Sequence, residues 1–244
     1  MKFSSYQTEN FEFEARKAVL GEGLFVTPSS IAWVDIESRT VFWNEKQYDL
    51  RDCVPSVIFT EIDGALLLGT DLGIQILHKT GRLEMAVKLE GHDPNEFRLN
   101  DGCVLGNQGF LVGAMSKKEP AKTPGAIYRF DLSGRSEKLD WDCHIPNGFV
   151  DLGNSSILIC DSSKCEIYKV NLSNDKHLID VWYSGSGPET PDGGCLLPDG
   201  HIAFAMWDGA KIQVFDIYGK PTRSIEVPAK RPTNCKFCII RKRL

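Results

Sequence analysis

Short runs of apolar and β-branched residues recur along the chain in pairs, and a few polar residues join the two runs of each pair. The second run usually alternates apolar and polar residues, which is typical of a strand with one face on the core. No segment carries an apolar stripe at helical spacing. The pattern therefore predicts an all-β protein with five strand pairs, 31–36 with 40–43, 65–70 with 73–77, 109–113 with 125–131, 156–160 with 165–170, and 201–205 with 211–216.

Another short segment precedes each pair, and these segments align on one position. The aligned positions are 22, 56, 101, 147, 192 and 234, which are 34, 45, 46, 45 and 42 residues apart. Six repeats of about this length match the blades of a β-propeller. We therefore expect residues 1–244 to form a single six-bladed β-propeller domain whose blades begin near these positions. Its C-terminal blade is incomplete, because the chain ends at Leu244.

The repeat phase also predicts a site. The first strand of each propeller blade lines the central channel, so the aligned residues Glu22, Asp101, Asn147 and Asp192 should meet at its mouth. Carboxylate and amide oxygens suit a hard divalent cation such as calcium, magnesium or manganese. The competing interpretation is that Asn-Gly and Asp-Gly pairs merely form turns at the strand entrances. Four oxygen donors at one register favour the metal site.

One connection is expanded. Between the second and third strands of the third repeat lie residues 116–124, whereas the other repeats have short turns. A long loop beside a site is typical of a lid. The alternative is a solvated loop without a role.

The composition of the chain excludes some classes of function. The chain has 28 basic and 33 acidic residues and a net charge of −5, which argues against nucleic-acid binding. No apolar run approaches the ~20 residues of a membrane span, and the N-terminus lacks the apolar stretch of a signal peptide. We therefore expect a cytoplasmic protein with neither a membrane nor a nucleic-acid partner.

The cysteines, histidines and serines of this sequence lack the spacing that other hydrolases and metal-binding proteins require. The eight cysteines are expected to be buried free thiols, and Cys235-x-x-Cys238 has no second pair for a zinc site. The five histidines show no H-E-x-x-H spacing. Ser162 and Ser163 lie outside a G-x-S-x-G elbow, which argues against a serine hydrolase.

Seven short stretches occur in the order and spacing of a known family between about residues 18 and 237. They are 20–23 (LGEG), 33–36 (WVDI), 98–102 (RLNDG), 125–129 (GAIYR), 146–148 (PNG), 191–193 (PDG) and 205–209 (AMWDG). Through them the sequence resembles the senescence marker protein/gluconolactonase group, which includes regucalcin and bacterial sugar lactonases. The resemblance implies a six-bladed propeller with one divalent metal ion, held by Glu22, Asn147 and Asp192.

The resemblance also implies substrate contacts. Arg98 and Asn100 would bind substrate, with Asp101 beside them, and Glu119 is the residue nearest to an acid that the family carries in the expanded loop. Glu119 is one residue out of the expected place. The fork of donors on Arg98 suits the ring or hydroxyl oxygens of a sugar lactone.

The implied activity is hydrolysis of a small sugar lactone to the aldonic acid. A metal polarises the carbonyl and activates water, and Asp192 would accept a proton as general base. Calcium is the expected ion, with zinc, manganese and magnesium left open. Two alternatives remain, a calcium-binding regulatory propeller without significant turnover and a truncated, inactive homologue.

Two departures from the family pattern matter. The first motif continues as Gly23-Leu24-Phe25-Val26 instead of with Pro and Trp. The family also continues beyond the segment that ends here at Leu244, so the sixth blade would have only its inner strand and an outer strand from residues 10–20. A truncated product, a shortened variant, or completion by another chain through self-association would each explain this, since an incomplete blade exposes strand edges.

Overall fold

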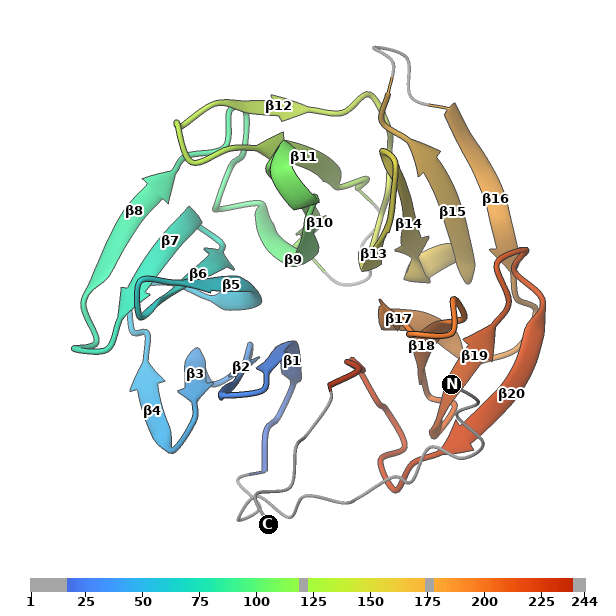
Figure 1. Ribbon diagram of the computed structural model, residues 1–244. Helices are drawn as coiled ribbons and strands as arrows, with labels where there is room; N and C mark the ends of the chain where they lie inside the picture. Colours follow the sequence, from blue (N-terminus) through green and yellow to red (C-terminus); the bar gives the residue numbers. More distant parts are fainter. Residues whose placement is uncertain (1–16, 119–122, 174–177, 239–244) are drawn as a thin grey trace.

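The chain forms five four-stranded antiparallel sheets arranged as the blades of a ring (Figure 1). The computed structural model describes residues 17–118, 123–173 and 178–238. The first two blades are β1 (Gly21–Thr27), β2 (Ser30–Asp35), β3 (Thr40–Trp43) and β4 (Lys46–Asp49), then β5 (Pro55–Ile62), β6 (Ala65–Thr70), β7 (Gly73–His78) and β8 (Leu83–Val87). The third is β9 (Phe97–Val104), β10 (Phe110–Ser116), β11 (Ala126–Phe130) and β12 (Ser136–Lys138). The last two are β13 (Pro146–Gly153), β14 (Ser156–Asp161), β15 (Glu166–Asn171) and β16 (Leu178–Ser184), then β17 (Thr190–Leu196), β18 (Ile202–Trp207), β19 (Lys211–Phe215) and β20 (Pro221–Glu226).

Each blade runs from an inner strand at the ring axis to an outer strand at the rim (Figure 1). The five predicted strand pairs are the second and third strands of the five blades. The first five aligned positions lie on the inner strands β1, β5, β9, β13 and β17. The all-β propeller is therefore confirmed.

The second strand of a blade is buried on both faces, which explains its continuous apolar sequence. In β6, Leu66 and Leu68 pack against blade one, whereas Leu67 packs against blade three. All three are at most 1% exposed. Apolar clusters of this kind lie at each of the four junctions between neighbouring blades, so burial holds the blades in a ring.

The sixth position of the ring holds residues 233–238, which we call the closing segment. It lies between β17 and β1 (Figure 1). The Gly193 amide of β17 donates to Thr233 O (2.8 Å), and Thr233 Oγ1 donates to Gly21 O of β1 (2.5 Å). In the described part of the chain, neither the closing segment nor residues 17–20 form a strand. The five blades are thus those of an incomplete six-bladed propeller.

Two expectations change or remain open here. Residues 17–20 do not supply the predicted outer strand of blade six, and residues 10–16 lie outside the described residues. Self-association through this part of the ring stays a prediction. Among the described residues, the two helices are short 3-10 turns, η1 (Gly106–Gln108) and η2 (Ser162–Lys164), and none is long and apolar enough to cross a membrane.

The cysteines are free, but fewer of them are buried than the sequence suggested. Cys53, Cys143 and Cys160 are buried, whereas the other five are partly exposed. Four of these five lie on inner strands or on the closing segment.

Candidate functional site

The first halves of the inner strands bring the aligned oxygen donors to one end of the channel. Asp101 Oδ2 of β9 accepts a hydrogen bond from the Gly148 amide of β13 (2.9 Å). Glu22 on β1 and Asp192 on β17 lie close enough for their charges to interact with each other and with Asp101. Residues spread over most of the sequence therefore share one site.

Irregular backbone aims these donors. The inner strands bulge between Glu22 and Phe25, between Asn147 and Val150, and between Pro191 and Gly194. The glycines that follow two of the donors have positive φ, 60° at Gly23 and 56° at Gly148, which is the left-handed region that glycine tolerates best. The Glu-Gly and Asn-Gly pairs thus lie at bulges within strands and do not form the turns of the competing interpretation.

Close packing of neighbouring segments is a second reason why glycine occupies positions next to the oxygen donors. A Cβ on Gly148 would lie 2.5 Å from Asp192 O and 2.6 Å from Cys160 Sγ. A Cβ on Gly193 would lie 2.4 Å from Asn234 Nδ2. At these positions β13 approaches β17, and β17 approaches the closing segment, so closely that only glycine fits.

A chain of hydrogen bonds orients the amide of Asn147. Asn100 Nδ2 donates to Asn147 Oδ1 (2.7 Å) and to Pro146 O (2.9 Å). Asn147 Nδ2 donates to Ser162 Oγ (3.0 Å), which donates in turn to Pro191 O (2.6 Å). An amide oxygen has two lone pairs, so Asn147 Oδ1 keeps one for a cation. Ser162 thus positions Asn147, a role that was not predicted from the sequence.

Two of the residues predicted to contact substrate, Arg98 and Asn100, touch each other. Arg98 Nη1 donates to Asn100 Oδ1 (2.5 Å) and to Leu99 O (3.1 Å). Arg98 is half-buried and Asn100 is 8% exposed. The guanidinium is therefore held beside the amide that orients Asn147.

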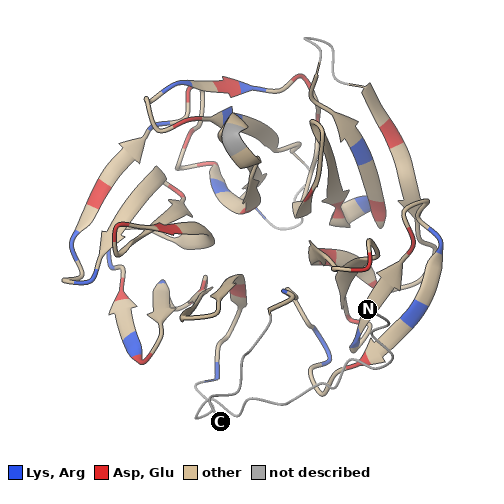
Figure 2. Ribbon diagram, in the orientation of Figure 1, with Lys and Arg blue, Asp and Glu red and all other residues tan. Residues whose placement is uncertain are grey.

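The carboxyl groups at the channel mouth are costly to ionise. Burial, followed by the charges of Asp192 and Asp101, raises the pKa of Glu22 well above its usual value. The Gly23 amide and the Arg98 charge lower this pKa, but by less. Burial and then Asp101 likewise raise the pKa of Asp192 well above its usual value. Figure 2 shows acidic residues near the axis on β1 and β17, while both signs of charge occupy the outer strands. A cation between these carboxylates would offset their repulsion.

The two aspartates differ in what their oxygens contact. Asp101 Oδ1 accepts from the Gly102 amide (2.8 Å) and Oδ2 from the Gly148 amide. This favours a positioning role that links β9 to β13 over the predicted substrate contact. Asp192 is 5% exposed, and its buried Oδ1 has no hydrogen-bond partner in the described residues. A buried, unpaired carboxylate oxygen is costly, and a cation or a substrate would satisfy it.

The donor set fits a hard cation only with the amide included. Among the described residues, no group of three or more His, Cys, Asp and Glu side chains is close enough to hold a metal ion. A cation site here must therefore combine the carboxylates of Glu22 and Asp192 with the Asn147 amide oxygen. Oxygen donors of these kinds are typical of calcium, magnesium and manganese sites.

The expanded loop leaves the blade at the site end of the channel. Ser116, the last residue of β10, pairs with Phe97, and Met115 pairs with Arg98. Lys117 Nζ then donates to Asp71 Oδ2 of blade two (2.8 Å). Glu119 lies outside the described residues, so its substrate contact and the lid remain predictions.

A set of aspartates that was not predicted from the sequence fixes the entrances of three inner strands. Asp35 accepts from the amides of Val19 (2.9 Å) and Leu20 (3.1 Å), just before Glu22. Asp71 accepts from the Val54 amide ahead of β5 (2.8 Å). Each aspartate ends or directly follows an apolar second strand, as in the runs WVD and GTD, which is the signal that could have found them.

Asp161 likewise fixes the entrance of β13, the strand that carries Asn147. It is fully buried, and its oxygens accept from the amides of His144 (3.1 Å) and Ile145 (3.2 Å) and from the Ser163 hydroxyl (2.6 Å). Although burial alone would raise the pKa of Asp161, these hydrogen bonds lower it below its usual value.

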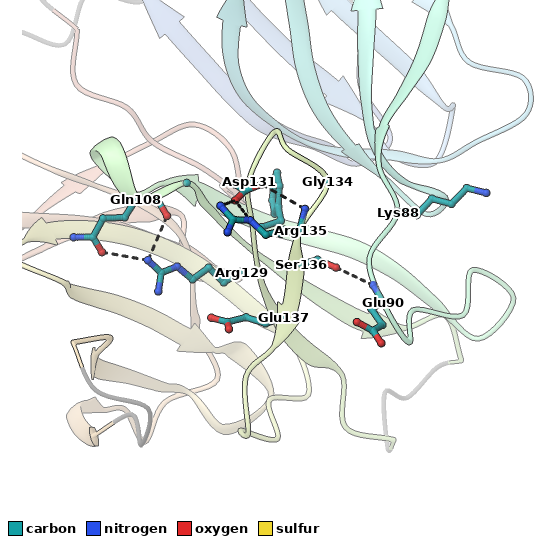
Figure 3. A pocket seen from close by; sticks show the side chains of 11 residues that line it. Lys88, Glu90, Gln108, Arg129, Asp131, Gly134, Arg135, Ser136 and Glu137 are labelled. Carbon is teal, nitrogen blue, oxygen red and sulfur yellow. Dashed lines mark hydrogen bonds and ion pairs between the residues drawn. The ribbon is translucent and has the colours of Figure 1, made fainter.

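The groove in Figure 3 is separate from this site. It has a volume of about 820 Å³ and lies between the segment after β8 and the strands β11 and β12 (Figure 3). Its charges balance, because its lining has three basic and three acidic side chains, of which Arg135 and Asp131 form an ion pair (2.9 Å). It contains no residue of the predicted site, so it is not the candidate functional site.

Known proteins resemble the chain across most of its length. It is 24% identical over 233 residues to "Pentonolactonase XacC" of Haloferax volcanii, a match covering 89% of this chain and 77% of the relative. It is 27% identical over 232 residues to "L-arabinolactonase" of Azospirillum brasilense, covering 88% and 76%. The solved structure of a calcium-binding protein, regucalcin, from Agrobacterium tumefaciens superimposes with a TM-score of 0.80 at 25% identity, covering 89% of this chain and 77% of that one.

The family model described as "SMP-30/Gluconolactonase/LRE-like region" matches residues 20–242. That range includes all five blades, the closing segment and Glu22, Asn147 and Asp192. The chain therefore belongs to the SMP-30/gluconolactonase/LRE-like family.

Proposed function

We propose that the protein is a metal-dependent hydrolase that opens a small sugar lactone to the aldonic acid. The observation that carries the proposal is the unpartnered, buried Oδ1 of Asp192 beside Glu22 and the oriented amide of Asn147. The similarity to two proteins named as sugar lactonases supports the substrate class.

Glu22, Asn147 and Asp192 would hold the cation, with calcium as the proposed ion. When bound, a divalent cation supplies a Lewis acid that polarises a carbonyl and lowers the pKa of water. The protein keeps this ligand set in place through Asn100, which orients Asn147, and through Asp35 and Asp161 at the strand entrances.

Asp192 is the proposed general base. Its carboxylate has two oxygens, so a ligand role leaves it able to accept the proton of the water that attacks the lactone carbonyl. Burial, and then the charge of Asp101, raises its pKa well above its usual value when no cation is bound, and a bound cation would favour the ionised form that accepts a proton.

Arg98 and Asn100 would orient the substrate. The planar guanidinium of Arg98 suits paired oxygens, and the Asn100 amide can both donate and accept. Because Arg98 donates to Asn100, a movement of either residue on substrate binding would also shift the other residue and Asn147.

A second function is favoured by the similarity to a structure described as a calcium-binding protein. Such a protein would bind the cation at the same residues without significant turnover. A cation binder of that kind would still use Asn100 to orient Asn147 but has no need of Arg98, whereas a lactonase does.

The test is hydrolysis of glucono-1,5-lactone and L-arabinono-1,4-lactone by the purified protein, followed by acid release. The protein would be assayed after chelation and again with calcium, zinc, manganese or magnesium restored. We expect activity that disappears with the chelator and returns with at least one metal. Folded protein that binds calcium but opens neither lactone would support the second function.

A further inference from the structure

Two thiols from distant parts of the chain meet where the ring closes. Cys195 lies near the end of β17, and Cys235 lies in the closing segment. The side chains of Cys195 and Cys235 interact with each other. Cys235 Sγ also lies 3.8 Å from Gly193 O and 3.6 Å from Ala203 O, and Ala203 pairs with Cys195 across the sheet. The two side chains are therefore neighbours at the junction of β17 and the closing segment.

The surroundings favour the anionic form of one sulfur. The interaction with the Cys235 side chain, together with the Lys236 charge and the Phe237 amide, holds the pKa of Cys195 below its usual value despite burial, whereas the same interaction and burial raise the pKa of Cys235. Lys236 is itself held near by a hydrogen bond from its Nζ to Gly194 O (3.3 Å). By contrast, burial raises the pKa of Cys143 and Cys160 above the usual value. Reactive cysteines typically have such a nearby cation and a resolving thiol.

Both sulfurs belong to residues that solvent can reach. Cys195 and Cys235 are each partly exposed, unlike Cys160, which is fully buried. Neither thiol has a part in the proposed hydrolysis.

We propose that Cys195 and Cys235 are a redox-sensitive pair, which a small hydroperoxide converts to a disulfide that fastens the closing segment to β17.

The chemistry balances with hydrogen peroxide as the oxidant. The Cys195 thiolate attacks one peroxide oxygen, the O–O bond breaks, and the leaving hydroxide takes up the proton that the thiol had released. The Cys235 sulfur then displaces the hydroxyl of the resulting sulfenic acid, and that hydroxyl leaves as water with the Cys235 proton. Two electrons pass from the two sulfurs to the peroxide, giving one disulfide and two waters.

The bond would reinforce an existing contact. The Gly193 amide already donates to Thr233 O, so a disulfide two residues further along each segment adds a covalent link at the same junction. It would close a loop of about 40 residues, which restricts the unfolded chain. The oxidised protein should therefore be more stable than the reduced one, by about 5–10 °C in Tm.

The experiment treats the full chain with hydrogen peroxide under native conditions, blocks the remaining thiols, and maps the linked peptides by mass spectrometry. The matched variants are Cys195→Ser, Cys235→Ser and, as a control, Cys238→Ser, which removes the neighbouring thiol of the C-x-x-C pair. We expect a peptide linked through residues 195 and 235 in the wild type and in the control, and a higher Tm that a reductant reverses.

Three results would overturn the proposal. One is a link between Cys235 and Cys238 in place of the expected one. Another is a wild-type protein that stays fully reduced, or reaches only sulfinic acid, under conditions that oxidise a free thiol. The third is a Tm rise that persists in Cys195→Ser.

Discussion

Asp192 has an unusual combination of properties for a buried residue. It is 5% exposed, and one oxygen has no hydrogen-bond partner in the described residues, whereas Asp101 nearby is held by backbone amides. Equivalent positions in sequence thus have different roles, because the amides available to each differ. The repeat phase could predict that these residues meet, but only the contacts separate the proposed ligand from the residue that links two strands.

The first prediction concerns cation binding. Saturating calcium should raise the Tm of the wild type by about 5–10 °C at 100 times its Kd, because the cation offsets repulsion between Glu22 and Asp192. Asp192→Asn should lose most of this shift in a thermal titration. Asp151→Asn on the same channel wall, where Asp151 Oδ1 accepts from the Gly153 amide (2.8 Å), is the control and should keep it. Equal shifts in both variants would contradict the assigned ligand.

The second prediction concerns Asp161 and pH. Because hydrogen bonds lower the pKa of Asp161 in the folded protein, its ionised form stabilises the fold above the unfolded value of about 4, and this stability is lost as pH falls through the lower folded value. Asp161→Asn should therefore reduce the free energy of unfolding by about 1–3 kcal/mol at pH 7, and by less near pH 3. Denaturant unfolding at both pH values measures this, with the exposed Asp180→Asn as control. A difference that grows on acidification would contradict the assignment.

At the scale of elements, the sequence could predict the second and third strands of every blade because both carry a clear apolar pattern. The outer strands are different. β4 (KQYD) and β20 (PTRSIE) are largely exposed, so they leave little apolar signal and are defined by pairing with the third strand. The bulges of the inner strands were also unpredicted, although the glycines behind Glu22 and Asn147 mark them.

The third prediction tests such a bulge. Gly148→Ala should destabilise the protein by about 2–4 kcal/mol, because it combines a positive φ with contacts of 2.5–2.6 Å to Asp192 O and Cys160 Sγ. Gly106→Ala has a similar φ of 50° and nothing within 4 Å, so it isolates the backbone strain of about 1 kcal/mol. Denaturant unfolding of both variants separates the two effects. Equal losses would show that the close approach of β13 and β17 is unimportant.

At the scale of the whole molecule, five blades form the ring and the closing segment connects its two ends. The resemblance could predict an incomplete sixth blade, but the contacts that replace it could not be predicted, because they involve residues without strand pattern. Thr233 is the clearest example, since it accepts from β17 and donates to β1.

The fourth prediction follows from that bridge. Thr233→Ala should increase hydrogen exchange in β1 and lower the Tm by about 2–4 °C, which corresponds to one lost hydrogen bond. The control is Thr222→Ala, which removes a hydrogen bond from Thr222 Oγ1 to Val214 O within blade five (3.2 Å) and should leave exchange in β1 unchanged. Unaltered exchange in β1 of Thr233→Ala would contradict the bridging role.

The most direct test of the central claim is the rate of lactone opening by the metal-loaded wild type and by Asp192→Ala, compared at equal cation occupancy and with the fold of each checked by circular dichroism. Removing both a ligand and the general base should lower kcat/KM by a factor of at least about 10³. Arg98→Ala should weaken turnover while leaving calcium binding intact. If Asp192→Ala opens the lactone at the wild-type rate, the channel mouth is not the site of the chemistry.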